Sequence, residues 1–264
     1  MKRLLIVSLL FVGVHANSKS SPNKKQIVVA VIDTGIDPQL MKHNSICKDG
    51  HKDFTGTGLV DNHGHGTHIS GIIDQYVKNY IFTYKKDSNL IDNIQENYCQ
   101  IIIKFFNTKA SDGDTLSNVI LSFRWAIDHN VDIINFSGGG TEFSKEEKLV
   151  VVEALNKGIK IVTADSNEKS DIDKNKYYPA MYDKRIHIVG NLVKDTNERA
   201  PSSNYGASIN TWEIGTHVLS RLPGKSFGIM TGTSQAAAVK TGKIVREMLL
   251  KEAVPTLVKV KYKN

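Results

Sequence analysis

Five short apolar runs, all rich in β-branched residues, do most to constrain how this chain can fold. Runs of this kind, without the polar alternation of a half-exposed strand, are typical of strands covered on both faces. Helical patterns lie between several of them, and alternating strands and helices favour a mostly parallel sheet packed between helices. The sequence therefore predicts an α/β fold with helices on both faces of the sheet. The five runs are residues 26–33, 100–106, 131–136, 159–163 and 185–189.

The helices can be placed from apolar spacing and from capping residues. Apolar residues recur at helical spacing over residues 116–127. Ser144 and Glu147 have the spacing of a capping box, which opens a helix that we expect to end near Lys157. A further helical run covers residues 234–250.

The segment before this last helix has a different pattern. Residues 216–221 and 226–230 flank a Leu-Pro-Gly-Lys sequence, which indicates a β-hairpin. We find no internal repeat and no low-complexity stretch, and the 40% hydrophobic content is enough for a sizeable core. We therefore expect one domain over residues 26–264.

The first residues have the pattern of an export signal. Two basic residues precede an apolar run over residues 4–14, which ends at small residues typical of a cleavage site. This run is shorter than the roughly 20 apolar residues that a spanning helix needs, so we expect no membrane span. We expect residues 1–16 to be a signal peptide and residues 17–25 a short polar lead segment. The mature protein would then be secreted or periplasmic.

The charge balance does not indicate a nucleic-acid partner. The chain has 34 basic and 27 acidic residues, for a formal charge of +7. The basic residues form no long block and are not interleaved with aromatic residues, as they are in many nucleic-acid-binding proteins. We therefore interpret the positive charge as a solvated surface.

A glycine-containing stretch near the C-terminus can present a nucleophile. Gly232 and Thr233 precede Ser234, and three alanines follow it. A glycine permits a sharp turn, and a serine at a helix start has an exposed hydroxyl beside unpaired backbone amides. The alternative is a serine that only caps the helix.

Two upstream residues can activate such a serine. Asp33 follows the first apolar run, at the end of a probable parallel strand, where α/β sheets usually place their chemistry. His65 lies where a glycine-rich turn meets a helical pattern. A serine becomes a strong nucleophile when an imidazole takes its proton and a carboxylate orients the imidazole. Asp33 and His65 can equally be a loop cap and a structural histidine.

The motifs around these residues resemble the subtilisin-like serine proteases (peptidase S8, subtilase). VIDTGID contains Asp33, HGTHISG contains His65 and GTSQAAA contains Ser234. INFSGGG, YPA and SNYG are accessory matches, and all of them occur in the family's order over residues 26–245. The aspartate, histidine, serine order is the one found in subtilisin. The resemblance implies a three-layer, subtilisin-like fold.

The same resemblance implies a role for each matching residue. Asp33 would orient the imidazole, His65 would be the general base and acid, and Ser234 would attack the substrate. Asn167 would be the side-chain donor of the oxyanion hole, beside the backbone amide of Ser234. The chain would be a serine endopeptidase acting on protein or peptide substrates, with no cofactor required for the chemistry.

The resemblance also indicates where substrate would bind. Ser137, Gly138 and Gly139 look like the edge that pairs with an extended substrate backbone. The family commonly has a large residue at the position of Gly138, which predicts a more open pocket wall here. The family's glycine before the oxyanion asparagine is Ser166 in this chain. Its calcium-binding loops are not matched, so we assign no metal and leave structural calcium open.

Two further expectations concern folding. Secreted relatives usually have a folding prodomain, but only about ten residues lie between the predicted signal cleavage site and the first strand. The chain would then fold unaided, use another protein as chaperone and inhibitor, or not be a conventional secreted protease. We expect it to be a monomer. Cys47 and Cys99 lie near predicted strands that could be neighbours in this fold, and a disulfide between them is a hypothesis.

Two competing functions remain at this point. A catalytically impaired pseudoprotease would keep the fold and bind peptides or proteins without cleaving them. A zinc hydrolase is suggested by His63, His65 and His68, but the chain lacks an aspartate at Thr67 and the further ligands that such a site needs.

Overall fold

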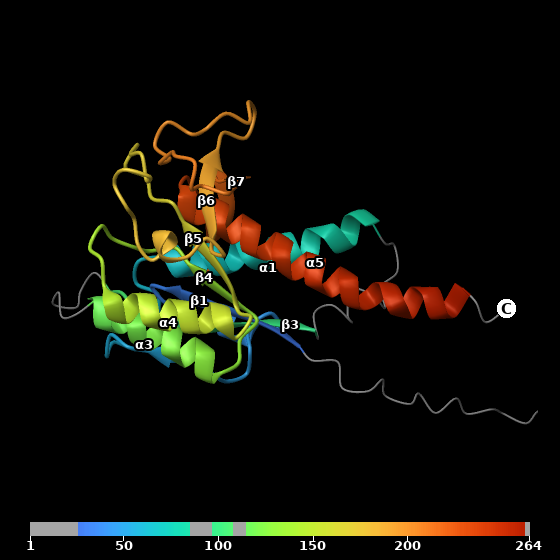
Figure 1. The fold of residues 1–264 in the computed structure, drawn as a ribbon. Helices are drawn as coiled ribbons and strands as arrows, with labels where there is room; N and C mark the ends of the chain where they lie inside the picture. The colour runs from blue at the N-terminus through green and yellow to red at the C-terminus, as the bar shows by residue number, and fades with distance from the viewer. Residues whose placement is uncertain (1–25, 85–96, 108–114, 262–264) are drawn as a thin grey trace, which may run out of the picture.

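The computed structural model describes the chain over residues 26–84, 97–107 and 115–261 (Figure 1). The predicted signal peptide and the lead segment at residues 17–25 lie outside the described residues. In the described part of the chain, no helix combines the length and the apolar character that crossing a membrane requires.

Seven strands form one parallel sheet, in the order β2-β3-β1-β4-β5-β6-β7. The first strand in sequence, β1, lies near the centre of the sheet, where it pairs with both β3 and β4. The central strands are almost completely buried, as their apolar runs predict. The strands are β1 (Ile27–Asp33), β2 (Lys52–Asp53), β3 (Tyr98–Lys104), β4 (Ile133–Phe136), β5 (Lys160–Ala164), β6 (His187–Leu192) and β7 (Thr211–Ile214).

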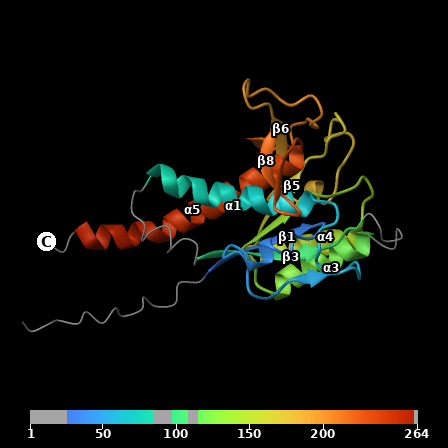
Figure 2. The same cartoon turned by 180° about the vertical axis from the view of Figure 1, so that it is seen from behind.

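In the described part of the chain, α-helices cover both faces of this sheet (Figures 1 and 2). The helices α3 (Thr115–Asp128) and α4 (Lys145–Asn156) bury their apolar sides against one face, where Phe123 and Phe136 contact edge to face. The helices α1 (His65–Tyr84) and α5 (Thr233–Lys261) pack against the opposite face. This is the predicted three-layer α/β fold.

The predicted elements are present, with shifted boundaries. The hairpin forms as β8 (Val218–Leu222) and β9 (Ser226–Met230), and it packs over α1. The last helix extends to Lys261, beyond the predicted end at residue 250. The structure adds the edge strands β2 and β7, which the sequence did not predict, because one has two residues and the other is only partly buried.

Only half of the predicted capping box at α4 forms. The Ser144 hydroxyl accepts a hydrogen bond from the Glu147 amide at 3.2 Å, as expected. The Glu147 carboxylate, however, accepts its hydrogen bond from the Tyr182 hydroxyl at 2.7 Å, and that hydroxyl accepts one from the Ser144 amide. A tertiary contact therefore replaces the local one.

The two cysteines are joined. Cys47 and Cys99 form a disulfide between the segment before β2 and the beginning of β3. This confirms the hypothesis drawn from the sequence. The fold brings the two segments side by side, and the Cys47 amide donates a hydrogen bond to the Gln100 carbonyl oxygen.

Candidate active site

The carboxyl end of β1 places a carboxylate against a histidine. Asp33 is the last residue of β1, and it is only 3% exposed. Its Oδ1 accepts hydrogen bonds from the Thr34 amide at 2.8 Å and from Nδ1 of His65 at 2.7 Å. His65 is the first residue of α1. An Nδ1–H that donates to Asp33 leaves Nε2 as the ring's basic nitrogen.

Glycines make this approach of helix and loop possible. A Cβ atom at Gly66 would lie 2.3 Å from the carbonyl oxygen of Gly35. Gly35 itself has a φ of +111°, a left-handed conformation that favours glycine. The Gly66 amide donates to the Thr34 hydroxyl at 2.9 Å, which ties the first turn of α1 to the loop after β1.

Asp61 fixes the same junction, a role that its sequence motif alone did not predict. The residue is 2% exposed and precedes α1 in the manner of an N-terminal cap. Burial would raise the pKa of its carboxyl group, but hydrogen bonds hold that pKa below its usual value. An aspartate just before a helix was the available signal. Its donors are Thr34 Oγ1, His63 N, Gly64 N, Thr67 N and Thr67 Oγ1.

The charge around His65 favours its protonated form. Burial lowers the pKa of the imidazole, but the carboxylate of Asp33, with a contribution from Asp61, outweighs burial. The net effect raises the pKa above its ordinary value of 6.5. The neighbouring carboxylates therefore stabilise the imidazolium that forms when the ring accepts a proton.

Replacing Gly66 with alanine is expected to lower the thermal unfolding midpoint by several degrees. Alanine is favoured over glycine in a helix by about 1 kcal/mol. The clash with the Gly35 backbone outweighs that gain, since forcing an extra carbon into a packed site costs about 1–3 kcal/mol. Gly140→Ala is the matched control, because a Cβ there meets nothing within 4 Å. An unchanged midpoint for Gly66→Ala would contradict the packing argument.

The candidate nucleophile lies at the beginning of α5. Ser234 is the second residue of that helix, where the first backbone amides have no partner within the helix. Its hydroxyl donates to the Ser137 carbonyl oxygen at 3.4 Å, which places the predicted substrate edge beside it. Among the described residues, no hydrogen bond joins Ser234 to His65. Catalytic hydrogen bonds are often long in ligand-free sites and shorten only when substrate is bound.

The candidate oxyanion donor lies on the other side of Ser234. Asn167 follows β5, and its Oδ1 accepts a hydrogen bond from the Thr233 amide at 3.1 Å. Because a backbone N–H can only donate, this contact assigns the oxygen and turns the Nδ2 donor away from Thr233. The preceding residue, Ser166, has a φ of +81°, so this loop keeps a conformation that favours glycine without having one.

The predicted substrate edge forms the wall opposite this loop. Beyond it, Gly140 pairs with Tyr178 through two backbone hydrogen bonds of 2.9 and 2.7 Å. A side chain at position 138 would meet phenylalanine rings, so the fold leaves little room there for the large residue common in the family. A Cβ atom at Gly138 would lie 2.9 Å from Cζ of Phe136 and 3.1 Å from Cζ of Phe105.

The clustered histidines have separate environments. The His68 ring is held at 3.1 Å from the Gly228 carbonyl oxygen, while the exposed His63 ring lies edge to face with His65. Within the described ranges, no group of three or more His, Cys, Asp or Glu side chains could hold a metal ion.

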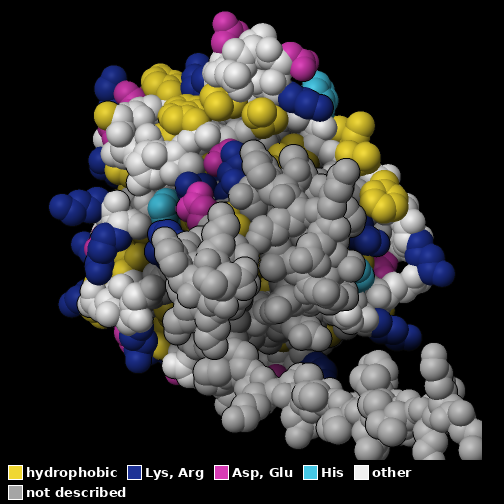
Figure 3. Space-filling view, turned by 90° about the vertical axis from the view of Figure 1, so that its right-hand side faces the viewer, with side chains coloured by type: hydrophobic (Ala, Val, Ile, Leu, Met, Phe, Trp, Pro, Cys, Tyr) yellow, Lys and Arg dark blue, Asp and Glu magenta, His cyan; other side chains and the backbone are white. Residues whose placement is uncertain are grey.

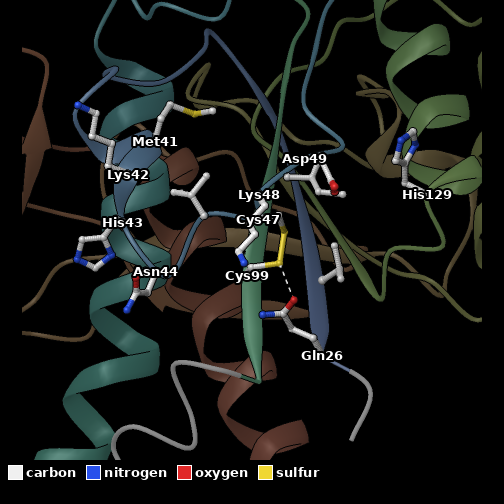
Figure 4. A pocket seen from close by; sticks show the side chains of 13 residues that line it. Gln26, Met41, Lys42, His43, Asn44, Cys47, Lys48, Asp49, Cys99 and His129 are labelled. Carbon is white, nitrogen blue, oxygen red and sulfur yellow. Dashed lines mark hydrogen bonds between the residues drawn. A yellow bond between two sulfur atoms is a disulfide. The ribbon is translucent and has the colours of Figure 1, made fainter. Parts of the chain in front are cut away.

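A large cavity lies far from these residues. It has a volume of about 970 Å³ and opens beside the disulfide (Figure 4). The Gln26 side chain, just before β1, contacts the Cys99 sulfur there at 3.3 Å. Asp33 lies at the opposite end of this strand, which at about 3.3 Å per residue is some 20 Å away. The cavity is therefore separate from the candidate active site.

Comparisons with known proteins agree on one family. The model of the Subtilase family matches residues 24–262. The chain is 30% identical to subtilisin E of Bacillus subtilis (strain 168), over 85% of this chain and 55% of that protein. It is 33% identical to the major intracellular serine protease of the same organism, over 83% of this chain and 67% of that protein.

A solved structure has the same fold. A cold adapted subtilisin-like serine proteinase superimposes with a TM-score of 0.65 at 23% sequence identity, over 87% of this chain and 77% of that one. The chain spans about half the length of several curated relatives that it matches.

Proposed function

The chain belongs to the Subtilase family, and from that premise we propose that it is a serine endopeptidase. It would hydrolyse peptide bonds of protein or peptide substrates through an acyl-enzyme intermediate. The observation that carries the proposal is the 2.7 Å hydrogen bond between a buried Asp33 and His65. Because Nδ1 of His65 is bonded to Asp33, Nε2 of the same ring is free to act as a base, and Ser234 at the start of α5 is the candidate nucleophile.

The first half of the reaction forms the acyl-enzyme. Nε2 of His65 takes the hydroxyl proton of Ser234 as Oγ bonds to the substrate carbonyl carbon. Asp33 holds the ring in the correct tautomer and stabilises its positive charge. When the C–N bond breaks, the imidazolium gives its proton to the leaving amine, and the acyl group stays on Oγ.

The tetrahedral intermediate carries negative charge on one oxygen. Nδ2 of Asn167 and the backbone amide of Ser234 would donate to that oxygen, since both lie at the junction of β5 and α5. A single donor of this kind contributes about 3–4 kcal/mol to lowering the barrier. The extended substrate would pair with Ser137, Gly138 and Gly139.

The second half of the reaction restores the enzyme. His65 takes a proton from a water molecule, whose oxygen bonds to the acyl carbon. The ester bond then breaks, Ser234 regains a proton from His65, and the acid product leaves. These steps use only the side chains named and water, so we propose no cofactor for the chemistry.

The biological setting follows from the sequence. We propose that residues 1–16 export the protein and that residues 26–264 form a monomeric peptidase domain, which folds unaided or with a separate chaperone and inhibitor. On the face visible in Figure 3, lysine and arginine side chains are spread around the periphery, with acidic side chains among them. This arrangement supports a solvated surface.

A second candidate is a pseudoprotease that binds peptides without cleaving them. The observation that favours it is the hydrogen bond of Ser234 to Ser137, in which the hydroxyl donates to an acceptor other than the base. The strained Ser166 beside the oxyanion donor points the same way. Such a protein would keep the peptide-pairing edge and lose the nucleophile.

Labelling with a fluorophosphonate probe separates the two candidates. The probe forms a covalent bond only with an activated serine, so we expect the purified chain to be labelled and Ser234→Ala to remain unlabelled. Thermal unfolding of both proteins checks that they are folded. A folded but unlabelled wild-type protein would reject the peptidase and favour the pseudoprotease.

A further inference from the structure

Two backbone segments flank the candidate nucleophile. The Ser137 carbonyl lies 3.4 Å from the Ser234 hydroxyl on one side. On the other side, Oδ1 of Asn167 accepts a hydrogen bond from the Thr233 amide at 3.1 Å. If the substrate carbonyl sits on Ser234 with its oxygen toward Asn167, its side chain must enter the space between these segments.

The ring of Tyr177 already occupies that space. A Cβ atom built on Gly139 would lie 2.6 Å from Cε1 of Tyr177 and 2.7 Å from Cζ, so the far end of the ring touches the proposed substrate edge. At its tip, the phenol hydroxyl lies close enough to the Ser166 side chain, which belongs to the opposite segment, for that side chain to lower the phenol pKa slightly against the larger effect of burial. The ring therefore bridges the two walls.

The packing around this ring keeps it in place. Tyr177 contacts the apolar core under α3 and α4, and its backbone carbonyl accepts a hydrogen bond from the Met181 amide at 2.9 Å. Burial raises the pKa of the phenol, so the hydroxyl stays neutral at physiological pH. A large substrate side chain would have to displace the ring and break its contact with Ser166.

We propose that Tyr177 restricts the residue on the acyl side of the cleaved bond to a small one: glycine, alanine or serine. The proposal rests on the proposed endopeptidase function and deepens it, because it names the class of peptide that the site accepts. Tyr177 acts as a specificity-determining residue here and takes no part in proton transfer.

The test compares matched peptides that differ only in this residue, alanine or phenylalanine. For wild-type protein we expect kcat/KM to favour alanine by about 100-fold or more, since even one methylene in a tight pocket changes it 10–200-fold. Tyr177→Ala opens the space, and we expect it to cleave the phenylalanine peptide at least as fast as the alanine peptide. Peptidyl boronic acids with the same two side chains give a second readout, their inhibition constants.

Two more variants control the test. Tyr177→Phe keeps the ring and loses only the hydroxyl, so it should retain the preference for alanine. Tyr177→Leu keeps apolar packing against the core but does not reach Ser166, so it should accept larger residues even if Tyr177→Ala is too unstable to purify.

Each outcome decides the proposal. Equal cleavage of both peptides by wild-type protein overturns it, and so does a preference that persists in Tyr177→Ala and Tyr177→Leu. Loss of the preference in Tyr177→Phe would assign selectivity to the hydroxyl and also contradict it. A folded protein that neither reacts with fluorophosphonate nor cleaves any peptide rejects the endopeptidase function itself. A protein that reacts and cleaves without preference rejects only the role of Tyr177.

Discussion

Replacing His65 with alanine is expected to lower kcat/KM for peptide cleavage by about 10⁶-fold, and adding Ser234→Ala should lower it no further. The two residues act as one unit, because a serine without its base is a poor nucleophile and a base without the serine has nothing to deprotonate. The residual rate enhancement in either variant comes from the oxyanion donors and from substrate binding, which the substitutions leave in place.

The measurement is a cycle of three variants, assayed with an alanine-containing peptide: His65→Ala, Ser234→Ala and the double variant. His63→Ala is the matched control, since His63 is exposed and its ring only flanks that of His65. We expect it to change kcat/KM by less than about tenfold. Losses that multiply in the double variant would show that the two residues act independently, which contradicts the proposed mechanism.

Replacing Asp165 with asparagine is expected to stabilise the fold, and by more as the pH rises. Asp165 is fully buried directly after β5, where its Oδ2 accepts a hydrogen bond from Ser203 at 3.2 Å. The Thr233 hydroxyl lies close enough to lower the pKa slightly, yet Asp165 Oδ1 and Thr233 Oγ1 complete no well-formed hydrogen bond with any described residue. Burial dominates and raises the pKa of Asp165 to about 8.

The sign of the effect follows from proton binding. Between the usual pKa of 3.8 and about 8, the folded chain keeps a proton on Asp165 that the unfolded chain has released. The contribution of this group to the free energy of unfolding is therefore largest below about pH 4 and falls until about pH 8. Asparagine has no such loss and also supplies a donor for the Thr233 hydroxyl. We expect a stabilisation of a few kcal/mol at pH 9 and little change at pH 4.

Urea unfolding at pH 4, 6 and 9 measures this difference. The variants are best compared in a Ser234→Ala background, which prevents self-digestion. Asp195→Asn provides the control, because Asp195 is exposed and should show no pH-dependent difference. A stabilisation by Asp165→Asn of the same size at pH 4 and 9 would contradict a proton held on the buried carboxyl group.

The sequence predicts this fold well where burial determines the pattern. The run ending at Asp33 is apolar on both faces because β1 has sheet neighbours on both sides and helices above and below, so the pattern and the structure agree. The strand β2 has only two residues, which no periodicity can reveal. The half-formed capping box at α4 depends on Tyr182, 35 residues beyond Glu147, and local spacing could not predict it.

In the candidate site, too, some residues can be recognised from the sequence and others only from the fold. Asp33, His65 and Ser234 stand in short glycine-containing motifs that are visible in a linear sequence, and close backbone approach requires the glycines at Gly35 and Gly66. Tyr177 and Asp165 have no such motif, because what makes them important is a contact made through the fold. Gly139 meets Tyr177 from 38 positions away in the chain, and Asp165 meets Ser203 from the same separation.

The packing of α1 against α5 determines when, during synthesis and folding, the candidate active site is assembled. His65 begins one of these helices and Ser234 begins the other, so the pair is assembled only after most of the chain is made and folded. A parallel sheet with a central first strand has many distant contacts, and such topologies fold slowly. Under the proposed endopeptidase function, a nascent or half-folded copy would therefore be inactive, while folded copies could cleave it. During refolding, cleavage of unfolded copies by copies that have already folded would limit the yield of intact protein. Because this cleavage is bimolecular, lowering the protein concentration would raise the yield more than a longer refolding time.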